Sequence, residues 1–217
     1  MRAYGCDLRG LDEIPGIQEI MAQYGFDVVK IMAAVAKYAE EKGYFYMGQL
    51  VNEANPQAHY KTTGPELVAD TDGKIDIAVM LAGTAGTLAG IGTYLQEHIE
   101  GVKIVGVQPT PDSLSGPGDN VDTIDGVVRF DTPEGCRHPF VIRRNFKYDE
   151  VIDVTGADSY ATARAVAQSD GILLGASAAA ALTAAKQLAL RPENEGKTIV
   201  AILADNGMKY LSTNMYK

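Results

Sequence analysis

The chain has 217 residues, 46% of them hydrophobic, and a formal net charge of -9 at pH 7. This length allows one large domain or two small ones with a buried core. The acidic balance, with no basic cluster longer than Arg143-Arg144, argues against nucleic acid or an anionic membrane surface as partners. No apolar run approaches the ~20 residues that a membrane span needs.

The cysteines and histidines give no sign of a metal site or a disulfide framework. Cys6 and Cys136 lie far apart, and no secretory signal is visible at the start of the sequence. We therefore expect reduced thiols and a cytoplasmic location. The histidines, His59, His98 and His138, show no metal-ligand spacing, so we expect no metal and regard them as unpromising for function.

The first part of the chain predicts helices with one short strand between them. Residues 15–42 are expected to be helical, because apolar residues of their second half fall on one face and a glycine follows as a C-terminal cap. Residues 44–47 then predict a strand, and residues 52–56 a loop. A further helix is expected to start at Thr62 or Thr63, either of which could cap it.

From residue 62 onward the pattern is that of an α/β fold. Residues 75–81 form a largely apolar run of strand length, typical of a strand buried on both faces. Residues 103–108 predict the next strand, and apolar residues at helical spacing between the two runs predict a helix. Strand, helix and strand in this order imply a right-handed βαβ unit in a parallel sheet.

The remainder continues the same alternation after a long interruption. Residues 109–144 are rich in proline and glycine and predict a long loop. Thr155, followed by Asp158, resembles a capping box at the start of a helix. The other expected elements are a strand at 151–154, a return to the sheet at 171–175, an alanine-rich helix over 177–190 and a final strand at 198–203. The expected fold class is therefore α/β, with three layers around a mostly parallel sheet.

A glycine- and threonine-rich loop separates the strand at 75–81 from the helix that follows. It reads Gly83-Thr84-Ala85-Gly86-Thr87. Backbone N–H groups at a helix N-terminus favour an anion, and the two threonine hydroxyls add donors that suit a phosphate monoester. The loop matches neither the dinucleotide fingerprint nor the P-loop. The alternative is a tight strand-to-helix turn whose glycines only allow close packing.

Two further junctions are expected at the same edge of the sheet. Ser177 follows Gly175 at a strand-to-helix junction, where a plain N-cap is the simplest interpretation. The tripeptide Asp205-Asn206-Gly207 follows the final strand, where a simple turn is the alternative. Three junctions that converge on one edge favour a ligand crevice there.

Together these segments resemble the cysteine synthases (O-acetylserine sulfhydrylases), which belong with cystathionine β-synthase to the fold-type II pyridoxal-phosphate enzymes. The matching stretches are residues 3–5, 52–66 (NEANPQAHYKTTGPE), 83–88, 103–109, 171–180 and 197–213 (KTIVAILADNGMKYLST). The chain resembles the C-terminal two-thirds of these enzymes. The resemblance implies a remnant of the smaller domain over residues 1–56 and a large α/β domain over residues 57–217.

The resemblance also implies roles for individual residues. It implies that the phosphate of pyridoxal phosphate is bound by Gly83, Thr84, Ala85, Gly86 and Thr87. It implies that Asn206 faces the pyridine nitrogen, that Ser177 lies near the cofactor, and that Gln49 helps to hold the substrate carboxylate. The implied reaction is β-replacement on an O-activated serine, of the O-acetylserine plus sulfide type, with a small amino acid as substrate. The implied partner is a second copy in a homodimer or a complementing chain.

Several departures from the family pattern weaken this assignment. The Schiff-base lysine of the family lies upstream of the matched region, and none of the lysines of this chain matches it, so we expect no catalytic residue here and no activity of the chain alone. Ala85 replaces a glycine, where a Cβ would crowd the phosphate or oppose a positive φ. Asn206 replaces a serine or threonine, and Gln108 a glutamate. The alternatives are a truncated enzyme, one half of a split enzyme, and a non-catalytic remnant that binds a phospho-ligand or a partner. A nucleotide-binding module is disfavoured by the loop spacing.

Overall fold

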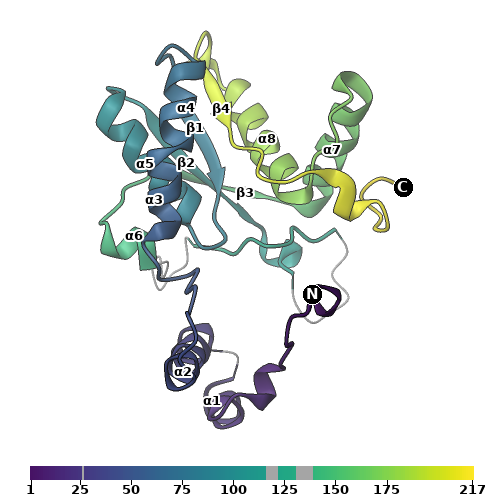
Figure 1. Cartoon of the computed structure of the whole chain (residues 1–217). Coiled ribbons are helices and arrows are strands. Elements are labelled where there is room, and N and C mark those ends of the chain that lie inside the picture. Colours follow the sequence, from purple (N-terminus) through teal and green to yellow (C-terminus); the bar gives the residue numbers. More distant parts are fainter. Residues whose placement is uncertain (26, 116–121, 131–138) are drawn as a thin grey trace. The chain divides into compact units, whose positions relative to one another are not determined.

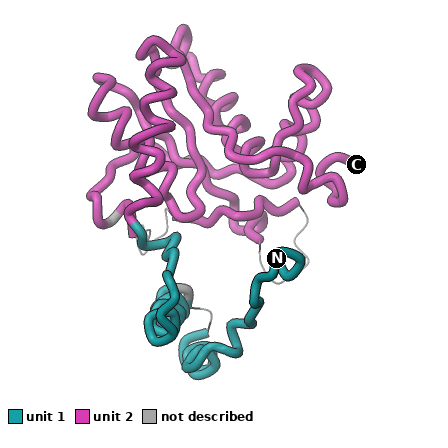
Figure 2. The backbone as a smooth tube through the Cα atoms, in the orientation of Figure 1, with its two compact units in different colours: residues 1–52 teal, residues 53–217 magenta. Residues whose placement is uncertain are grey.

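A computed structural model describes residues 1–25, 27–115, 122–130 and 139–217 (Figure 1). The chain divides into two compact units, residues 1–52 and residues 53–217 (Figure 2). The assignment of residues 1–56 to a smaller domain stays a prediction. Cys136 and His138 lie outside the described residues. Among the described helices, none combines the length and the apolar character that a membrane crossing requires.

Unit 1 consists mainly of two helices. They are α1 (Ile17–Tyr24) and α2 (Val28–Glu41), preceded by the short 3-10 turns η1 (Arg2–Tyr4) and η2 (Leu11–Glu13). The single helix predicted over residues 15–42 is wrong, because Gly25 turns the chain with φ 65° and ψ -151°, a backbone conformation that is essentially restricted to glycine. Gly43 ends α2 with φ 68°, so the predicted glycine cap is confirmed.

Residues 44–47 do not form the predicted strand. They carry no regular secondary structure, and Phe45 and Met47 are 81% and 70% exposed. In the part of the chain that the structure describes, no strand pairs with this segment. Local β-propensity therefore does not suffice here, because a strand needs a neighbour to accept its backbone hydrogen bonds.

The core of unit 2 is a parallel sheet. Its described strands run in the order β3-β2-β1-β4. Their bounds are β1 (Ile77–Leu81), β2 (Lys103–Pro109), β3 (Glu150–Val154) and β4 (Ile199–Ala201). The central strand β1 pairs with both neighbours, so that Ile77 lies opposite Lys103 on β2 and opposite Ile199 on β4. The predicted parallel sheet is confirmed, and its strands all end at one edge.

Helices cover both faces of this sheet (Figure 1). They are α3 (Ala54–Lys61), α4 (Thr63–Asp70), α5 (Gly86–His98), α6 (Pro139–Arg143), α7 (Gly156–Asp170) and α8 (Ala176–Ala189), with short turns η3 (Pro111–Ser113), η4 (Pro192–Asn194) and η5 (Gly207–Tyr210). Alternate residues of β1 belong to different buried clusters: Val79 packs with residues of α7 and α8, and Met80 packs with residues of α5. The three-layer α/β fold and the strand buried on both faces are confirmed.

Helix starts were predicted with mixed success. Thr155 caps α7 as expected, since its Oγ1 accepts a hydrogen bond from the backbone N of Asp158 at 3.0 Å. Thr62 occupies the corresponding position before α4, but its hydroxyl donates back to the carbonyl of Ala58 at 2.9 Å and caps nothing. The loop predicted at residues 52–56 is wrong, because α3 starts within it.

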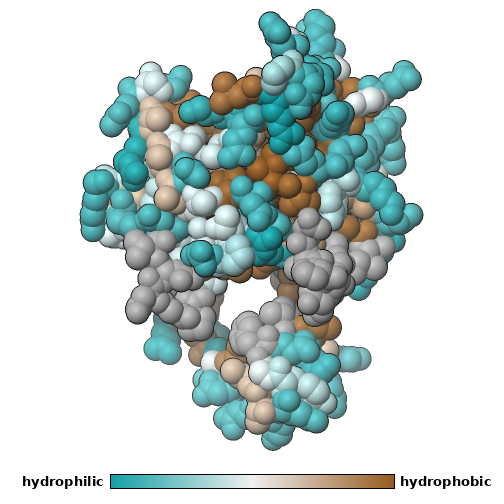
Figure 3. All heavy atoms as spheres, turned by 180° about the vertical axis from the view of Figure 1, so that it is seen from behind, coloured by the Kyte–Doolittle hydropathy of each residue, from teal (hydrophilic) through white to brown (hydrophobic). Residues whose placement is uncertain are grey.

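The return to the sheet predicted at residues 171–175 is also wrong. This segment forms no strand, and its Leu174 makes a single antiparallel bridge with Asn206. The sheet instead ends at β4, whose three residues are all partly exposed. The edge strand of the described sheet therefore carries apolar residues rather than the charged residues that usually protect a sheet edge. Figure 3 shows a further area of apolar side chains on the surface of unit 2.

A polar network around the buried side chain of Gln108 joins β2 to β3. This side chain is 2% exposed; its Nε2 donates to Asp153 Oδ1 at 2.7 Å, and its Oε1 accepts from the backbone N of Phe130 at 3.0 Å. Arg129 donates to the other carboxylate oxygen of Asp153 at 3.0 Å. An amide serves both partners of Gln108, whereas an ionised carboxylate has no donor for Asp153.

We therefore expect Gln108→Glu to lower the free energy of unfolding at pH 7 by about 2–3 kcal/mol, because it places two carboxylates in contact and removes a buried donor. The loss should grow as pH rises through the acidic range, since the folded state favours the protonated glutamate and binds more protons than the unfolded state. Urea unfolding at several pH values measures both effects.

The matched control is Gln96→Glu, which removes an exposed amide donor bonded to the carbonyl of Lys147. We expect it to cost less than about 1 kcal/mol. Equal losses for the two variants would contradict the role given to Gln108.

Candidate functional site

Three segments meet at the carboxyl edge of the sheet. The loop 83–87 follows β1, and residues 205–207 follow the neighbouring strand β4. The start of α8 joins them, because the backbone N of Gly175 donates to the carbonyl of Asp205 at 3.2 Å. The structure thus brings together the three junctions singled out from the sequence, and Ser177 lies with them at the start of α8.

Ala85 holds the most unusual backbone conformation of the loop. It is the N-cap residue of α5, with φ 63° and ψ 13°, and it is 2% exposed. Its Cβ does not prevent a positive φ, contrary to our expectation. For a residue other than glycine, this left-handed conformation costs about 1–2 kcal/mol. The loop is therefore held in a strained shape by the packing around it.

Hydrogen-bond donors converge on this turn. The first-turn N–H groups of α5 have no acceptor within the helix, by the geometry of any α-helix. Thr84 Oγ1 accepts from Asn55 Nδ2 at 3.0 Å and from the backbone N of Gly86 at 3.2 Å. With both its acceptor positions in use, this hydroxyl has its O–H left as a donor, which is the polarity that an anion requires.

His59 positions the second threonine of the loop. Its Nε2 lies 3.0 Å from Thr87 Oγ1, and its Nδ1 lies 3.1 Å from Thr63 Oγ1. Burial lowers the pKa of His59, so the imidazole is neutral at pH 7 and donates from one nitrogen only. The ring therefore holds Thr87 without adding charge, a contact that the sequence did not predict; the view of the histidines as unpromising for function stays a prediction.

A pair of glycines allows α3 to approach the loop. A Cβ at Gly86 would collide with the Asn55 side chain, and a Cβ at Gly90 would come within 2.8 Å of His59 Cβ. Gly86 and Gly90 are four residues apart on α5, as are Asn55 and His59 on α3. This matching of glycines and polar residues at helical spacing is the signal in the sequence that could have identified Asn55 and His59.

The segment 122–130 borders the other side of the loop. A Cβ at Gly83 would lie 2.5 Å from the carbonyl oxygen of Gly126. The backbone N of Val128 donates to the carbonyl of Ala82 at 3.0 Å. Gly83 is thus required for close packing, while the donors of the loop come from Thr84 onward.

Ser177 and Asn206 are held by different partners. Ser177 Oγ donates to Asp205 Oδ1 at 2.8 Å, and Gly175 rather than Ser177 occupies the N-cap position of α8, so the N-cap interpretation of Ser177 is wrong. Asn206 is exposed, and its Oδ1 accepts from the backbone N of Met208 at 3.1 Å. This bond orients the amide of Asn206 through its oxygen, and the NH₂ group remains as a donor that the bond does not use.

Gln49 belongs to unit 1 and its side chain is exposed, so its role stays a prediction.

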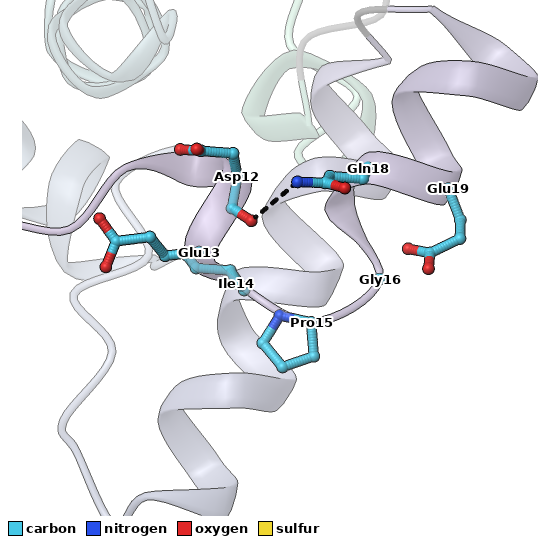
Figure 4. Close-up of a pocket in the computed structure, with 7 residues that line it drawn as sticks. All are labelled: Asp12, Glu13, Ile14, Pro15, Gly16, Gln18 and Glu19. Carbon is cyan, nitrogen blue, oxygen red and sulfur yellow. Dashed lines mark hydrogen bonds between the residues drawn. The ribbon is translucent and has the colours of Figure 1, made fainter.

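Unit 1 also carries a shallow pocket whose lining is acidic (Figure 4). The carboxylates of Asp12, Glu13 and Glu19 point in different directions there, and among the described residues no group of three possible ligands could hold a metal ion. The carboxyl edge of unit 2 is therefore the better candidate site.

The strain at Ala85 can be tested by comparing this N-cap residue with Ala89 inside α5. Ala85→Gly should leave the free energy of unfolding unchanged or raise it by up to about 1 kcal/mol, because relief of the positive φ offsets the lost methyl group. Ala89→Gly, at an equally buried position inside the helix, should lower it by about 1 kcal/mol or more. Chemical unfolding measures both, and equal losses would show that Ala85 is not strained.

Comparisons with known proteins agree on one family. The family model described as "Pyridoxal-phosphate dependent enzyme" matches residues 10–205. Cysteine synthase 3 of Caenorhabditis elegans is 33% identical over 217 residues, which is 100% of this chain and 59% of that protein. A cysteine synthase of Staphylococcus aureus is 34% identical, and the match covers 99% of this chain and 73% of that protein.

The solved structures point the same way. Cysteine synthase from Entamoeba histolytica has a TM-score of 0.71 at 36% identity, covering 86% of this chain and 54% of that one. The O-acetylserine-dependent cystathionine β-synthase from Helicobacter pylori has a TM-score of 0.70 at 29% identity, covering 86% of this chain and 60% of that one. This chain thus spans little more than half the length of several relatives. It belongs to the pyridoxal-phosphate-dependent enzymes, among the cysteine synthases and their relatives.

Proposed function

We propose that this chain supplies the phosphate-binding part of an enzyme that carries out β-replacement on an O-activated serine, of the O-acetylserine plus sulfide type. The observation that carries the proposal is the donor-lined loop 83–87 at the start of α5, in a chain of this family. When bound, pyridoxal phosphate supplies the electron sink for bond breaking at the substrate amino acid.

The residues present at the loop fit a phosphate group. The first-turn amides of α5 after Gly86, whose N–H is bonded to Thr84, and the hydroxyl of Thr84 are hydrogen-bond donors. The hydroxyl of Thr87 is a further donor in the tautomer in which His59 Nε2 carries the proton, and residues 83–87 include no carboxylate. His59 keeps Thr87 in place as a neutral group, so the attraction comes from oriented dipoles rather than from a lysine or arginine. This preformed arrangement would hold a dianion despite the net charge of -9 of the chain.

In this proposal, Asn206 contacts the ring of the cofactor and Gln49 contacts the substrate. The oxygen of Asn206 is bonded to the backbone of Met208, and its NH₂ group is a donor that suits an unprotonated ring nitrogen as acceptor. Ser177 supports the site through Asp205 rather than by touching the cofactor. Gln49 helps to hold the carboxylate of the small amino-acid substrate. The Schiff-base lysine comes from outside these 217 residues, from a complementing chain or from a preceding part of the same polypeptide, and the assembly is a cytoplasmic homodimer.

The phosphate site can be tested without lysine chemistry by using pyridoxine 5'-phosphate, which has no aldehyde. We expect it to bind the chain at least about tenfold more tightly than pyridoxine, a difference of about 1.4 kcal/mol supplied by the loop donors. Thr84→Ala combined with Thr87→Ala should abolish this difference. Isothermal titration calorimetry measures both affinities.

Thr93→Ala is the control, because Thr93 lies further along α5. It should leave the preference for the phosphate ester unchanged. Equal binding of pyridoxine and its phosphate ester by the wild-type chain would contradict the proposal.

A polypeptide of these 217 residues should form no cysteine from O-acetylserine and sulfide when pyridoxal phosphate is added, because no residue in it is assigned to the Schiff base. Colorimetric detection of cysteine measures this, with a full-length cysteine synthase as the positive control. Turnover together with borohydride trapping of pyridoxal phosphate on a single lysine would contradict the expectation.

The alternative is a non-catalytic role in binding a phosphorylated ligand. The same donors support it, since nothing in loop 83–87 requires a ring on the ligand. The two functions separate on that point: a cofactor site binds pyridoxine 5'-phosphate more tightly than glycerol 3-phosphate, whereas a general phosphate site binds them equally.

A further inference from the structure

The dipeptide Asn206-Gly207 has the composition that most favours loss of ammonia from an asparagine side chain. Asn206 is exposed, and it is the one asparagine of the sequence that a glycine follows. In such a pair, the backbone nitrogen of the glycine attacks the side-chain carbonyl carbon of the asparagine. Glycine allows this attack most readily, because it has no side chain to crowd the nitrogen and its backbone rotates freely. Asn206 is therefore the position where deamidation of this chain is most expected.

The reaction consumes water and releases ammonia, and it needs no other reactant. The backbone nitrogen of Gly207 gives up its proton and forms a bond to Cγ of Asn206. The Cγ–Nδ2 bond breaks, and the amino group leaves with a proton as ammonia. Water then opens the cyclic imide at either of its ring carbonyl groups. The products are aspartate and isoaspartate at position 206, and both carry a carboxylate at neutral pH.

The folded turn holds this dipeptide in an arrangement that cannot react. The N–H of Gly207 donates to the carbonyl of Leu173 at 2.9 Å, and Gly207 is buried. Asn206 is extended, with φ -111° and ψ 164°, so its Cβ and the Gly207 nitrogen are not eclipsed about the Cα–C bond, as closure of the imide ring requires. The side-chain oxygen of Asn206 also accepts from the backbone N of Met208 at 3.1 Å. The turn must therefore open before the reaction can occur.

Asp205 fastens this turn to the structure around it. Its Oδ1 accepts from the backbone N of Ala178 at 2.9 Å and from Ser177 Oγ at 2.8 Å. Its Oδ2 accepts from the hydroxyl of Tyr210 at 2.9 Å, and its carbonyl accepts from the backbone N of Gly175 at 3.2 Å. Opening of the turn breaks bonds of this set, so the loss of one bond should make opening easier by about the contribution of that bond.

We propose that Asn206 is a deamidation site whose reaction rate is set by local opening of the turn formed by residues 205–207. The inference goes beyond the proposed function and does not depend on it, because it rests on the bonds of the turn alone. Its product would still affect the candidate site. A carboxylate only accepts hydrogen bonds, so deamidation removes the NH₂ donor that we propose for the ring of the cofactor.

The test compares the folded chain with the same chain unfolded in guanidinium chloride, at one mildly alkaline pH and one temperature. Proteolytic digestion followed by mass spectrometry measures the deamidated fraction at each asparagine. The reaction at Asn206 should be at least about tenfold slower in the folded chain, which corresponds to an opening free energy of about 1.4 kcal/mol or more. Asn214, which is exposed and precedes a methionine, should react slowly in both samples.

Two buried tyrosines provide a matched pair of variants. Tyr210 is 8% exposed, and Tyr210→Phe removes its bond to Asp205, which should raise the rate in the folded chain by about threefold to tenfold. Tyr160 is 5% exposed, and its hydroxyl donates to the carbonyl of Thr123 at 2.9 Å, outside the turn. Tyr160→Phe should keep the wild-type rate. Ser177→Ala also removes a bond to Asp205 and takes the place of Tyr210→Phe if that variant does not fold.

Several outcomes would overturn the inference. Equal rates in the folded and unfolded chains would show that the turn does not limit the reaction, and an unreactive Asn206 in the unfolded chain would show that it is no deamidation site. An unchanged rate in both Tyr210→Phe and Ser177→Ala, or equal acceleration in Tyr210→Phe and Tyr160→Phe, would place the limiting step outside the turn. None of these measurements uses a phosphate ligand, so they stand apart from the fate of the proposed function.

Discussion

The parallel pairing of β1 with both β2 and β4 is the constraint on which the rest of unit 2 depends. Because the register sets Ile77 opposite Ile199, the chain leaves β1 and β4 at neighbouring points of the same edge. The loop 83–87 and the residues 205–207 lie together for this reason, although more than a hundred residues separate them in sequence. The apolar faces of β1 stabilise this pairing by packing under α5 on one side and under α8 on the other.

Close backbone approach is the second requirement of the site, and glycines meet it at both helices. Gly86 and Gly90 allow α3 to bring Asn55 and His59 against the start of α5, and Gly175 allows Asp205 to reach the start of α8. The same packing device thus has opposite electrostatic results. At α5, the close approach brings in the neutral side chains of Asn55 and His59, which orient hydrogen-bond donors. At α8, it brings in the carboxylate of Asp205, which accepts a hydrogen bond from the start of that helix.

The sequence predicted those features that depend on local pattern. The apolar runs of β1 and β2, the cap at Thr155 and the loop 83–87 follow from spacing within a few residues, and all lie where expected. The broken helix at Gly25 and the unpaired segment 44–47 were missed, because a glycine inside a helical pattern is often tolerated and strand pairing is not local. The contact of His59 with Thr87 and that of Asp205 with Ala178 were missed for the same reason, since these partners lie 28 and 27 residues away in sequence.

The open first turn of α5 has a practical consequence for handling this protein. If loop 83–87 binds phosphate as proposed, its oriented amides and hydroxyls recognise the tetrahedral oxyanion and not what is attached to it, so phosphate or sulfate in a storage buffer would compete for the same turn. Such an ion would bind the folded chain and by mass action would raise the melting temperature as its concentration increases. A preparation in phosphate buffer would then look well folded and yet take up cofactor poorly, and exchange into an oxyanion-free buffer would reverse both effects.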